Sequence, residues 1–469
     1  MGDLLSILST SANALNTQQS VAQVASNNLD NVDTPGYSRQ TANLSSSTLD
    51  VLGGVVLGGG VSVTNVTQTR DRFVEAQMPG AQGAAAYTQA QSDALTSVDV
   101  LDASNADGIS STLSQFWTAL QSLSQDAGDS SLRTGAIESA QQVAASFNST
   151  ASGISEAQTG LDSQISASVT QVNTLSAQLA TLNTQIRGGT VNGQQPNDLL
   201  DARQQVQDQL VTLTGGQVVT DAQGDVNITL GDGTALVSGE TSATMAAVPD
   251  PTNNNHLAIQ ITRADGTGPV AESDSSIGGQ IGGWLSARDG ALQTAANSVD
   301  QLAFDFANAV NTAHSSSYGI DGSTGNALFT VGSTAAGTAA SITVNSAIVN
   351  DPSMLATMGS STAGDGDATG VQSMLNVENA AVSGGQDPSD ALAALTAQFG
   401  SSTQQATANS TADAATLTHL TTLRSSASGV SSDEELVNMQ RAQSAYQAIS
   451  KVITTAQTML DALMAIQTT

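Results

Sequence analysis

The chain has no cysteine among its 469 residues and a single lysine, Lys451. Without cysteine it has no disulfide framework, no thiolate nucleophile and no zinc–thiolate site. Eleven basic residues against 41 acidic ones give a net charge of −30, and the arginines are scattered along the sequence. Because phosphate-binding surfaces depend on clustered lysine and arginine, we expect neither nucleic acid nor an anionic membrane as a partner.

Long apolar runs and charged side chains are also scarce. No run of about 20 apolar residues is present, so we expect no membrane-spanning helix. The first residues have neither a basic region nor a continuous apolar region, so export would require a route without a cleaved signal peptide. Charged residues make up only 11% of the chain. Ser, Thr, Ala, Gln, Asn and Gly take their place, which suits a subunit that packs beside copies of itself.

The residue types needed for catalysis do not form a recognisable pattern. His256, His314 and His419 are far apart in the sequence and have no partners at metal-ligand spacing, so we expect them to be surface or loop histidines. The acidic turns at 321–322 and 365–367 do not complete the ligand spacing of an EF-hand. No nucleophile elbow and no phosphate-binding loop is found. The sequence therefore predicts no cofactor, no metal site and no enzymatic activity.

Apolar residues recur at three- and four-residue spacing at both ends of the chain, which predicts amphipathic helices that pack against a partner helix. The first such segment covers residues 4–32 and ends before a Pro35-Gly36 turn. The last begins at an acidic capping box, residues 432–435. The candidate assembly residues in and beside these segments are Leu4, Leu8, Leu15, Leu29, Tyr37, Tyr446, Ile449, Ile453, Leu460 and Leu463.

Between the ends, a long helix is followed by a region rich in short strands. Apolar residues at seven-residue spacing, from Ile165 to Ile186, predict a rod-forming helix that stops at Gly188-Gly189. A second helix begins at Pro196 and continues to about Leu213. From there to about residue 348, short β-prone runs alternate with turns. Those at 226–230 and 257–262 are typical of hairpins, and a helix at about 281–313 interrupts the strands.

This order predicts an elongated α+β molecule, mainly a helical rod, with paired terminal helices and both termini at one end. The expected division is 1–70 for the N-terminal axial helix and linker, 71–215 for the helical rod, 216–370 for a β-rich outer domain with one helix, 371–427 for returning rod helices, and 428–469 for the C-terminal axial helix.

Both ends also resemble a known group of proteins. Residues 24–40 are similar to the N-terminal signature of flagellar rod, hook and hook-associated proteins, and residues 428–435, 443–448 and 452–461 to their C-terminal signature. Three features select the hook-associated protein 1 (FlgK) family within this group. They are residues 36–40, the rod helix followed by residues 196–203, and Leu328-Phe329 leading to residues 342–345.

The resemblance implies an extracellular structural subunit of the flagellar hook–filament junction, exported by the flagellar type III system. It also implies a ring or helical layer of copies, contacts with hook protein and with the third hook-associated protein, and an export chaperone that binds the C-terminal region. One alternative is another axial subunit, a hook or distal rod protein, although the long rod argues against a hook protein. Others are a secreted coiled-coil adhesin and a cell-wall-cleaving enzyme, which would need a carboxylate or Cys/His constellation.

Overall fold

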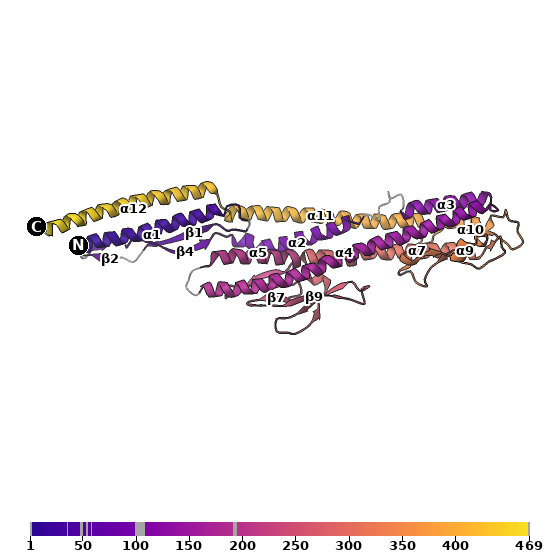
Figure 1. Ribbon diagram of the computed structural model, residues 1–469, viewed down its shortest axis with the longest axis horizontal. Helices are drawn as coiled ribbons and strands as arrows, with labels where there is room; N and C mark the ends of the chain where they lie inside the picture. The colour runs from indigo at the N-terminus through magenta and orange to yellow at the C-terminus, as the bar shows by residue number, and fades with distance from the viewer. Residues whose placement is uncertain are drawn as a thin grey trace.

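The structure is a computed structural model of an elongated molecule. It describes residues 2–34, 36–46, 50–52, 55–57, 59–98, 108–190 and 195–467. The long helices run along the long axis, and the N- and C-termini lie at the same end (Figure 1). This confirms the predicted mainly helical α+β architecture. None of the helices among these residues combines the length and the apolar character that a membrane span requires.

Two terminal helices and a strand pair form what we call the terminal module. Helix α1 (Gly2–Asp30) packs along α12 (Ser432–Gln467), as the paired-helix prediction requires. Strands β1 (Gln40–Ser46) and β4 (Val61–Gln68) pair antiparallel beside α1, with β2 (Asp50–Leu52) and β3 (Val55–Leu57) between them in sequence. The sequence did not predict β1, because polar contacts such as the 2.9 Å hydrogen bond from Asn43 to Asn65 stabilise it rather than an apolar face.

The helices of the rod include α2 (Arg72–Thr96), α3 (Ile109–Gln125), α4 (Ser130–Thr190), α5 (Asn197–Thr214) and α11 (Pro388–Ser428). The predicted end of the long helix at Gly188-Gly189 is confirmed to within one residue, because α4 ends at Thr190. The Thr190 hydroxyl donates to the carbonyl of Ile186 at 2.7 Å, so the last turn remains hydrogen-bonded.

The first group of strands packs on the middle of the rod, below α4 and α5 in Figure 1. A four-stranded antiparallel sheet contains β5 (Gln217–Thr220), β6 (Val226–Thr229), β7 (Ala235–Ser238) and β8 (Thr241–Ser242). A three-stranded sheet contains β9 (Thr244–Pro249), β10 (Leu257–Thr262) and β11 (Val270–Ala271). The β6–β7 and β10–β11 pairs confirm both predicted hairpins.

The prediction of one outer domain over residues 216–370 is wrong, because rod helices divide this segment. After a short 3₁₀ turn (Asp274–Ser276), α6 (Gly279–Ser286), a π-helical turn (Ala287–Leu292) and α7 (Gln293–Ser315) return along the rod. Phe306 of α7 is buried against Phe116 of α3 and Phe147 of α4, so this apolar face places α7 in the rod core.

The second group of strands lies at the end of the rod far from the termini. Its strands pair as β12 with β15 and β13 with β14, and Phe329 lies opposite Val344. The elements of this end are β12 (Tyr318–Gly319), β13 (Phe329–Thr330), α8 (Thr338–Ser341), β14 (Thr343–Val344), α9 (Ser346–Asn350), a 3₁₀ turn (Pro352–Met354), β15 (Ala356–Met358), α10 (Thr369–Leu375) and a 3₁₀ turn (Asn376–Asn379).

Candidate functional site: an elbow between the terminal helices and the rod

The chain crosses between the terminal module and the rod at an elbow, formed by residues 36–40 and 428–435. Helix α11 ends at Ser428 and α12 begins at Ser432. The backbone N–H of Arg39 donates to the carbonyl of Ser428 at 3.0 Å, which joins the two crossing segments. Gly36 has φ +81°, as a Pro-Gly turn requires, although Pro35 lies outside the described residues. A Cβ at Gly36 would lie 3.1 Å from the side chain of Gln205, so the turn sits tightly on α5.

A buried asparagine on α1 organises the inner side of the elbow. The Asn28 carboxamide donates to the carbonyl of Gln40 and accepts from its N–H, both at 2.9 Å. The same Asn28 oxygen accepts the hydroxyl of Tyr37 at 2.9 Å. The carboxamide thus replaces the peptide unit of a neighbouring strand, and fixes the start of β1 against α1.

Tyr37 remains a hydrogen-bond donor over the whole physiological pH range. Burial raises the pKa of its hydroxyl to about 12, and the negative charges of Asp201, Asp198 and Glu435 raise it in the same direction. Tyr37 was predicted as an assembly residue, but its hydrogen bond to Asn28 places it inside the elbow and not on the apolar face of a terminal helix.

An ion pair links the two ends of the sequence across the elbow. Arg39 contacts Glu434 at 2.8 Å and Glu435 at 3.1 Å, both in the first turn of α12. Glu434 is largely exposed and contributes at most about 1 kcal/mol, whereas Glu435 is buried and depends on Arg39. The helix cap lies one residue before the predicted one. Because α12 begins at Ser432, the Ser431 hydroxyl accepts the N–H of Glu434 at 3.5 Å.

The first turns of α5 attach the terminal module to the rod. The Asn197 side chain donates to the carbonyl of Val66 at 3.1 Å, and Gln68 donates to the carbonyl of Asn197 at 3.0 Å. Arg70 pairs with Asp201 at 3.0 Å. Thus α5 holds β4 and the short segment between β4 and α2.

The same segment of α5 also reaches the β-sheet region. Arg203 donates to the carbonyl of Gly224 at 2.8 Å and to the side chain of Asn183 at 3.3 Å. Residues 196–203, which carry part of the family resemblance, therefore connect three parts of the molecule.

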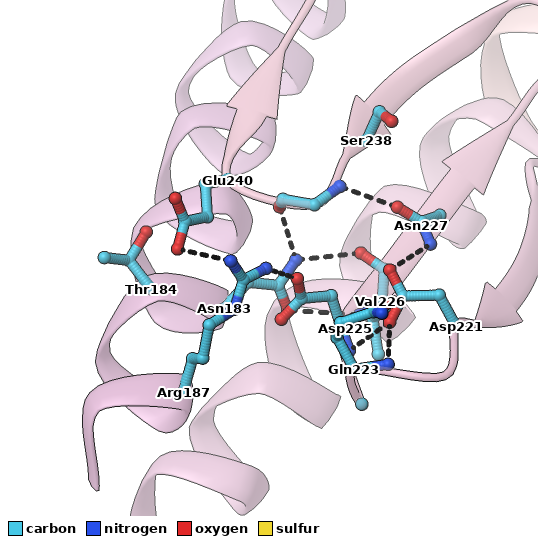
Figure 2. A network of polar contacts seen from close by, with 12 residues as sticks. Asn183, Thr184, Arg187, Asp221, Gln223, Asp225, Val226, Asn227, Ser238 and Glu240 are labelled. Carbon is cyan, nitrogen blue, oxygen red and sulfur yellow. Dashed lines mark hydrogen bonds and ion pairs between the residues drawn. The ribbon is translucent and has the colours of Figure 1, made fainter. Parts of the chain in front are cut away.

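Asn183 of α4 is the centre of the polar network in Figure 2, where it faces Val226 and lies beside the Arg187–Asp225 ion pair. Its amide donates to the carbonyls of Val226 and Gly239 at 2.9 and 2.7 Å, and its oxygen accepts the N–H of Val226 at 3.2 Å. Asn183 is fully buried, so these bonds replace all of its contacts with water. The network fastens the four-stranded sheet to the rod.

This arrangement of a helix asparagine recurs along the molecule. Asn173 pairs with both the N–H and the carbonyl of Met245, at 2.8 Å each, and Asn311 does the same with Phe329, also at 2.8 Å. With Asn28 and Asn183, four helix asparagines each hold one residue of extended chain. Sequence reasoning missed all four, although an asparagine beside the apolar seam of a predicted helix is a usable signal.

Two of the three histidines are buried. His256 lies in the loop before β10, as predicted, whereas His314 lies in α7, contrary to the prediction of surface or loop positions. His256 lies 2.8 Å from the carboxylate of Asp162. His314 donates from Nδ1 to the carbonyl of Asn326 at 2.8 Å and accepts the N–H of Ala356 at Nε2 at 3.0 Å, so the ring is neutral. Burial lowers the pKa of His314. Both rings join chain segments that are distant in sequence, a role that spacing alone does not reveal.

Comparison with known protein families assigns these features to one group. The model of the flagellar hook-associated protein FlgK helical domain matches residues 95–329, half of the chain. The chain belongs to the FlgK family. The models of the flagellar basal body rod protein and of the FlgEFG C-terminal region match residues 8–37 and 424–466. These two segments cover most of α1, all but the last residue of α12 and most of the elbow, so the terminal helices are the part that matches the rod and hook family models.

Known FlgK-family proteins resemble the chain over nearly its full length. Flagellar hook-associated protein 1 of Salmonella typhimurium is 27% identical, over 98% of this chain and 100% of the relative. The protein of the same description from Bacillus subtilis is 29% identical, over 97% and 96%. The solved hook junction protein FlgK from Burkholderia pseudomallei superimposes with a TM-score of 0.52 and 29% identity, over 55% of this chain and 47% of that one. The chain is thus an axial structural subunit of the bacterial flagellum, of the hook–filament junction type.

The structure brings most of the predicted assembly residues of this FlgK-family chain together within one molecule. Seven are partly buried on the faces of α1 and α12, the two helices that pack against each other: Leu4, Leu8, Leu15, Leu29, Ile449, Ile453 and Leu460. Tyr446 and Leu463 instead remain 41% and 39% exposed on the outside of the pair.

Proposed function

We propose that the chain forms an oligomeric ring or helical layer at the hook–filament junction, between hook protein and the third hook-associated protein. The observation that carries this proposal is the terminal module, held at one end of a long rod by an elbow. Residues 24–40 and 428–435, which resemble the axial signatures, include the residues that build it. Such a geometry fixes the direction of the helix pair before assembly and so lowers the entropy lost on joining the layer. The protein acts as a structural part and not as a catalyst.

The assembly surface that we propose is the outer flank of the helix pair. Val452, Met459 and Leu463 follow one another at seven- and four-residue spacing on α12, and each is 39–57% exposed. Burying such a side chain against a neighbouring copy contributes roughly 1.5–3 kcal/mol. The inner seam, with Leu8 and Leu460, would then hold α1 to α12, and the outer flank would hold copies to each other.

Export and domain organisation complete the proposal. The subunit leaves the cell through the flagellar type III system without a cleaved signal peptide, and a chaperone covers the exposed apolar residues of α12 before export. Residues 1–70 and 428–469 form the axial part, and 71–215 and 371–427 belong to the rod. Within residues 216–370, we propose that only residues 217–277 face outward, because their sheets pack on only one side of the rod.

Electron microscopy of a strain that lacks the chain provides the test. We expect hooks without filaments and filament subunits shed into the medium, both reversed by the intact gene. Filaments of normal number and length on the null strain would contradict the proposal. Normal filaments together with a loss of surface attachment would favour the adhesin alternative.

A further inference from the structure

A row of glutamines runs along the outer face of α4. Its members are exposed and seven residues apart: Gln164, Gln171, Gln178 and Gln185. Each directly precedes a residue on the buried apolar face of α4: Ile165, Val172, Leu179 and Ile186. A seven-residue period keeps side chains in line along a helix and matches the spacing at which a second helix is contacted. Such a row has the spacing that contact with another elongated surface requires.

This face carries no charge, although the chain has a net charge of −30. No charged residue occurs between Asp162 and Arg187, a stretch of 24 residues, nor between Asp390 and Asp413 on α11, a stretch of 22 residues. Copies of a strongly acidic protein repel each other, and screening in physiological salt acts over about 8 Å. Two copies therefore approach with the least electrostatic cost where such uncharged faces meet.

A groove beside α11 offers the matching surface. It has a volume of about 580 Å³ and lies between α11, the end of α2 and the π-helical turn with the start of α7. None of the described side chains that line it is charged. Its polar lining includes Gln91, Thr294, Ser298, Gln398, Ser402 and Gln405. Amide and hydroxyl groups of this kind both donate and accept hydrogen bonds, so they can pair with glutamine side chains.

The two surfaces lie on different flanks of the rod. Helix α11 packs against α2 and α7, whereas the glutamine-bearing half of α4 packs against α5 and the sheets. Both helices run along the long axis of the molecule (Figure 1). Copies that stand side by side with parallel axes can therefore place α4 of one against α11 of the next.

We propose that, in the assembled layer, the glutamine row on α4 of one copy packs into the groove beside α11 of a second copy of this chain. This inference rests on the proposed function and assigns the lateral contact of the rods. Because the two surfaces differ, the contact is head-to-tail and generates a ring or a helix of copies. The groove lies level with Gln158, which donates to the carbonyl of Arg288 at 3.1 Å. The centre of the row lies about 16 residues further along α4, so neighbouring copies are staggered by roughly 25 Å.

Disulfide cross-linking tests the contact directly, since the chain has no native cysteine. The test variant carries Gln171→Cys with Gln405→Cys, and the control carries Gln171→Cys with Ser114→Cys on the exposed face of α3. A disulfide requires Cα atoms within about 7 Å. We expect mild oxidation of isolated flagella to give a ladder of linked multimers with the first pair only. No ladder from the first pair in fully motile cells, or equal ladders from both pairs, overturns the contact.

Charge substitution gives a second, independent readout. Gln171→Glu with Gln178→Glu adds two negative charges to exposed positions and keeps side-chain size, so the purified protein should melt at the wild-type temperature. We expect at least a tenfold loss of filaments per cell, partly restored by Gln405→Lys in the groove. Wild-type filament numbers with the double glutamate variant overturn the lateral contact alone. Failure of the unaltered gene to restore filaments in the null strain overturns the proposed function itself.

Discussion

Replacing Asn183 by aspartate should release the four-stranded sheet from the rod. The change conserves shape but removes the two N–H groups that now donate to the carbonyls of Val226 and Gly239. Each carbonyl left without a donor costs about 1–3 kcal/mol, so the two together cost about 2–6 kcal/mol. The new carboxylate also faces these carbonyls inside a fully buried site.

Arg203 offsets part of that cost. It lies 3.3 Å from the Asn183 oxygen, and although burial lowers the pKa of Arg203 to about 10, its side chain remains charged at neutral pH. A new ion pair there contributes about 1 kcal/mol, which leaves a net destabilisation of roughly 1–5 kcal/mol. We expect the loss to be local, because the distal core around Phe306 does not include Asn183.

Hydrogen exchange and urea unfolding measure this prediction. Residues 226–242 should exchange at least about fivefold faster, since 1.36 kcal/mol corresponds to a factor of ten, with little change in α3 and α7. The matched control is Asn297→Asp on the exposed face of α7, where the oxygen still accepts from Gln293 and stability should change by less than about 0.5 kcal/mol. If the free energy of unfolding of Asn183→Asp lies within 1 kcal/mol of the wild-type value, the two hydrogen bonds from Asn183 do not hold the sheet to the rod, and the reasoning is refuted.

Three further perturbations test other parts of the molecule. Tyr37→Phe removes the hydroxyl donated to Asn28, and should cost about 1 kcal/mol and speed exchange at the N–H of Gln40. His314 is neutral when folded and its pKa is lowered, so stability should be complete above about pH 6.5 and fall as the pH drops further. Acid titration of His314→Gln should show a shallower fall; an unchanged slope would exclude His314. Leu460→Asp places a charge on the inner seam and should abolish filaments while circular dichroism shows an intact rod; Gln457→Asp, on an exposed position, should be tolerated.

Periodicity predicted the long helices well, because their seams are apolar and regular. The row from Ile165 to Ile186 and the alternating strands near Val226 both correspond to buried faces in the structure. The architecture, with both termini at one end, followed from the order of such elements along the chain. These features are local in sequence and depend mainly on burial.

Features that depend on polar pairing between distant segments were not predictable from local pattern. Strand β1 has no apolar face, and the tight elbow depends on Arg39 meeting residues almost 400 positions away. The predicted outer domain, residues 216–370, is divided because α7 packs in the rod core. The apolar seam of one helix does not specify which neighbour that helix packs against. The sequence likewise does not distinguish residues between α1 and α12, such as Leu460, from residues on the outside of the pair, such as Leu463. That distinction depends on how the two helices pack against each other.

Cryo-electron microscopy of the hook–filament junction, in cells whose only hook-associated protein 1 is this chain, shows whether the chain forms the junction through its terminal helices. We expect a layer of this chain between hook and filament, with the α1–α12 pair toward the central axis and the rod outside it. A junction that assembles without the chain, or a layer in which the terminal helices point away from the axis, would contradict this expectation.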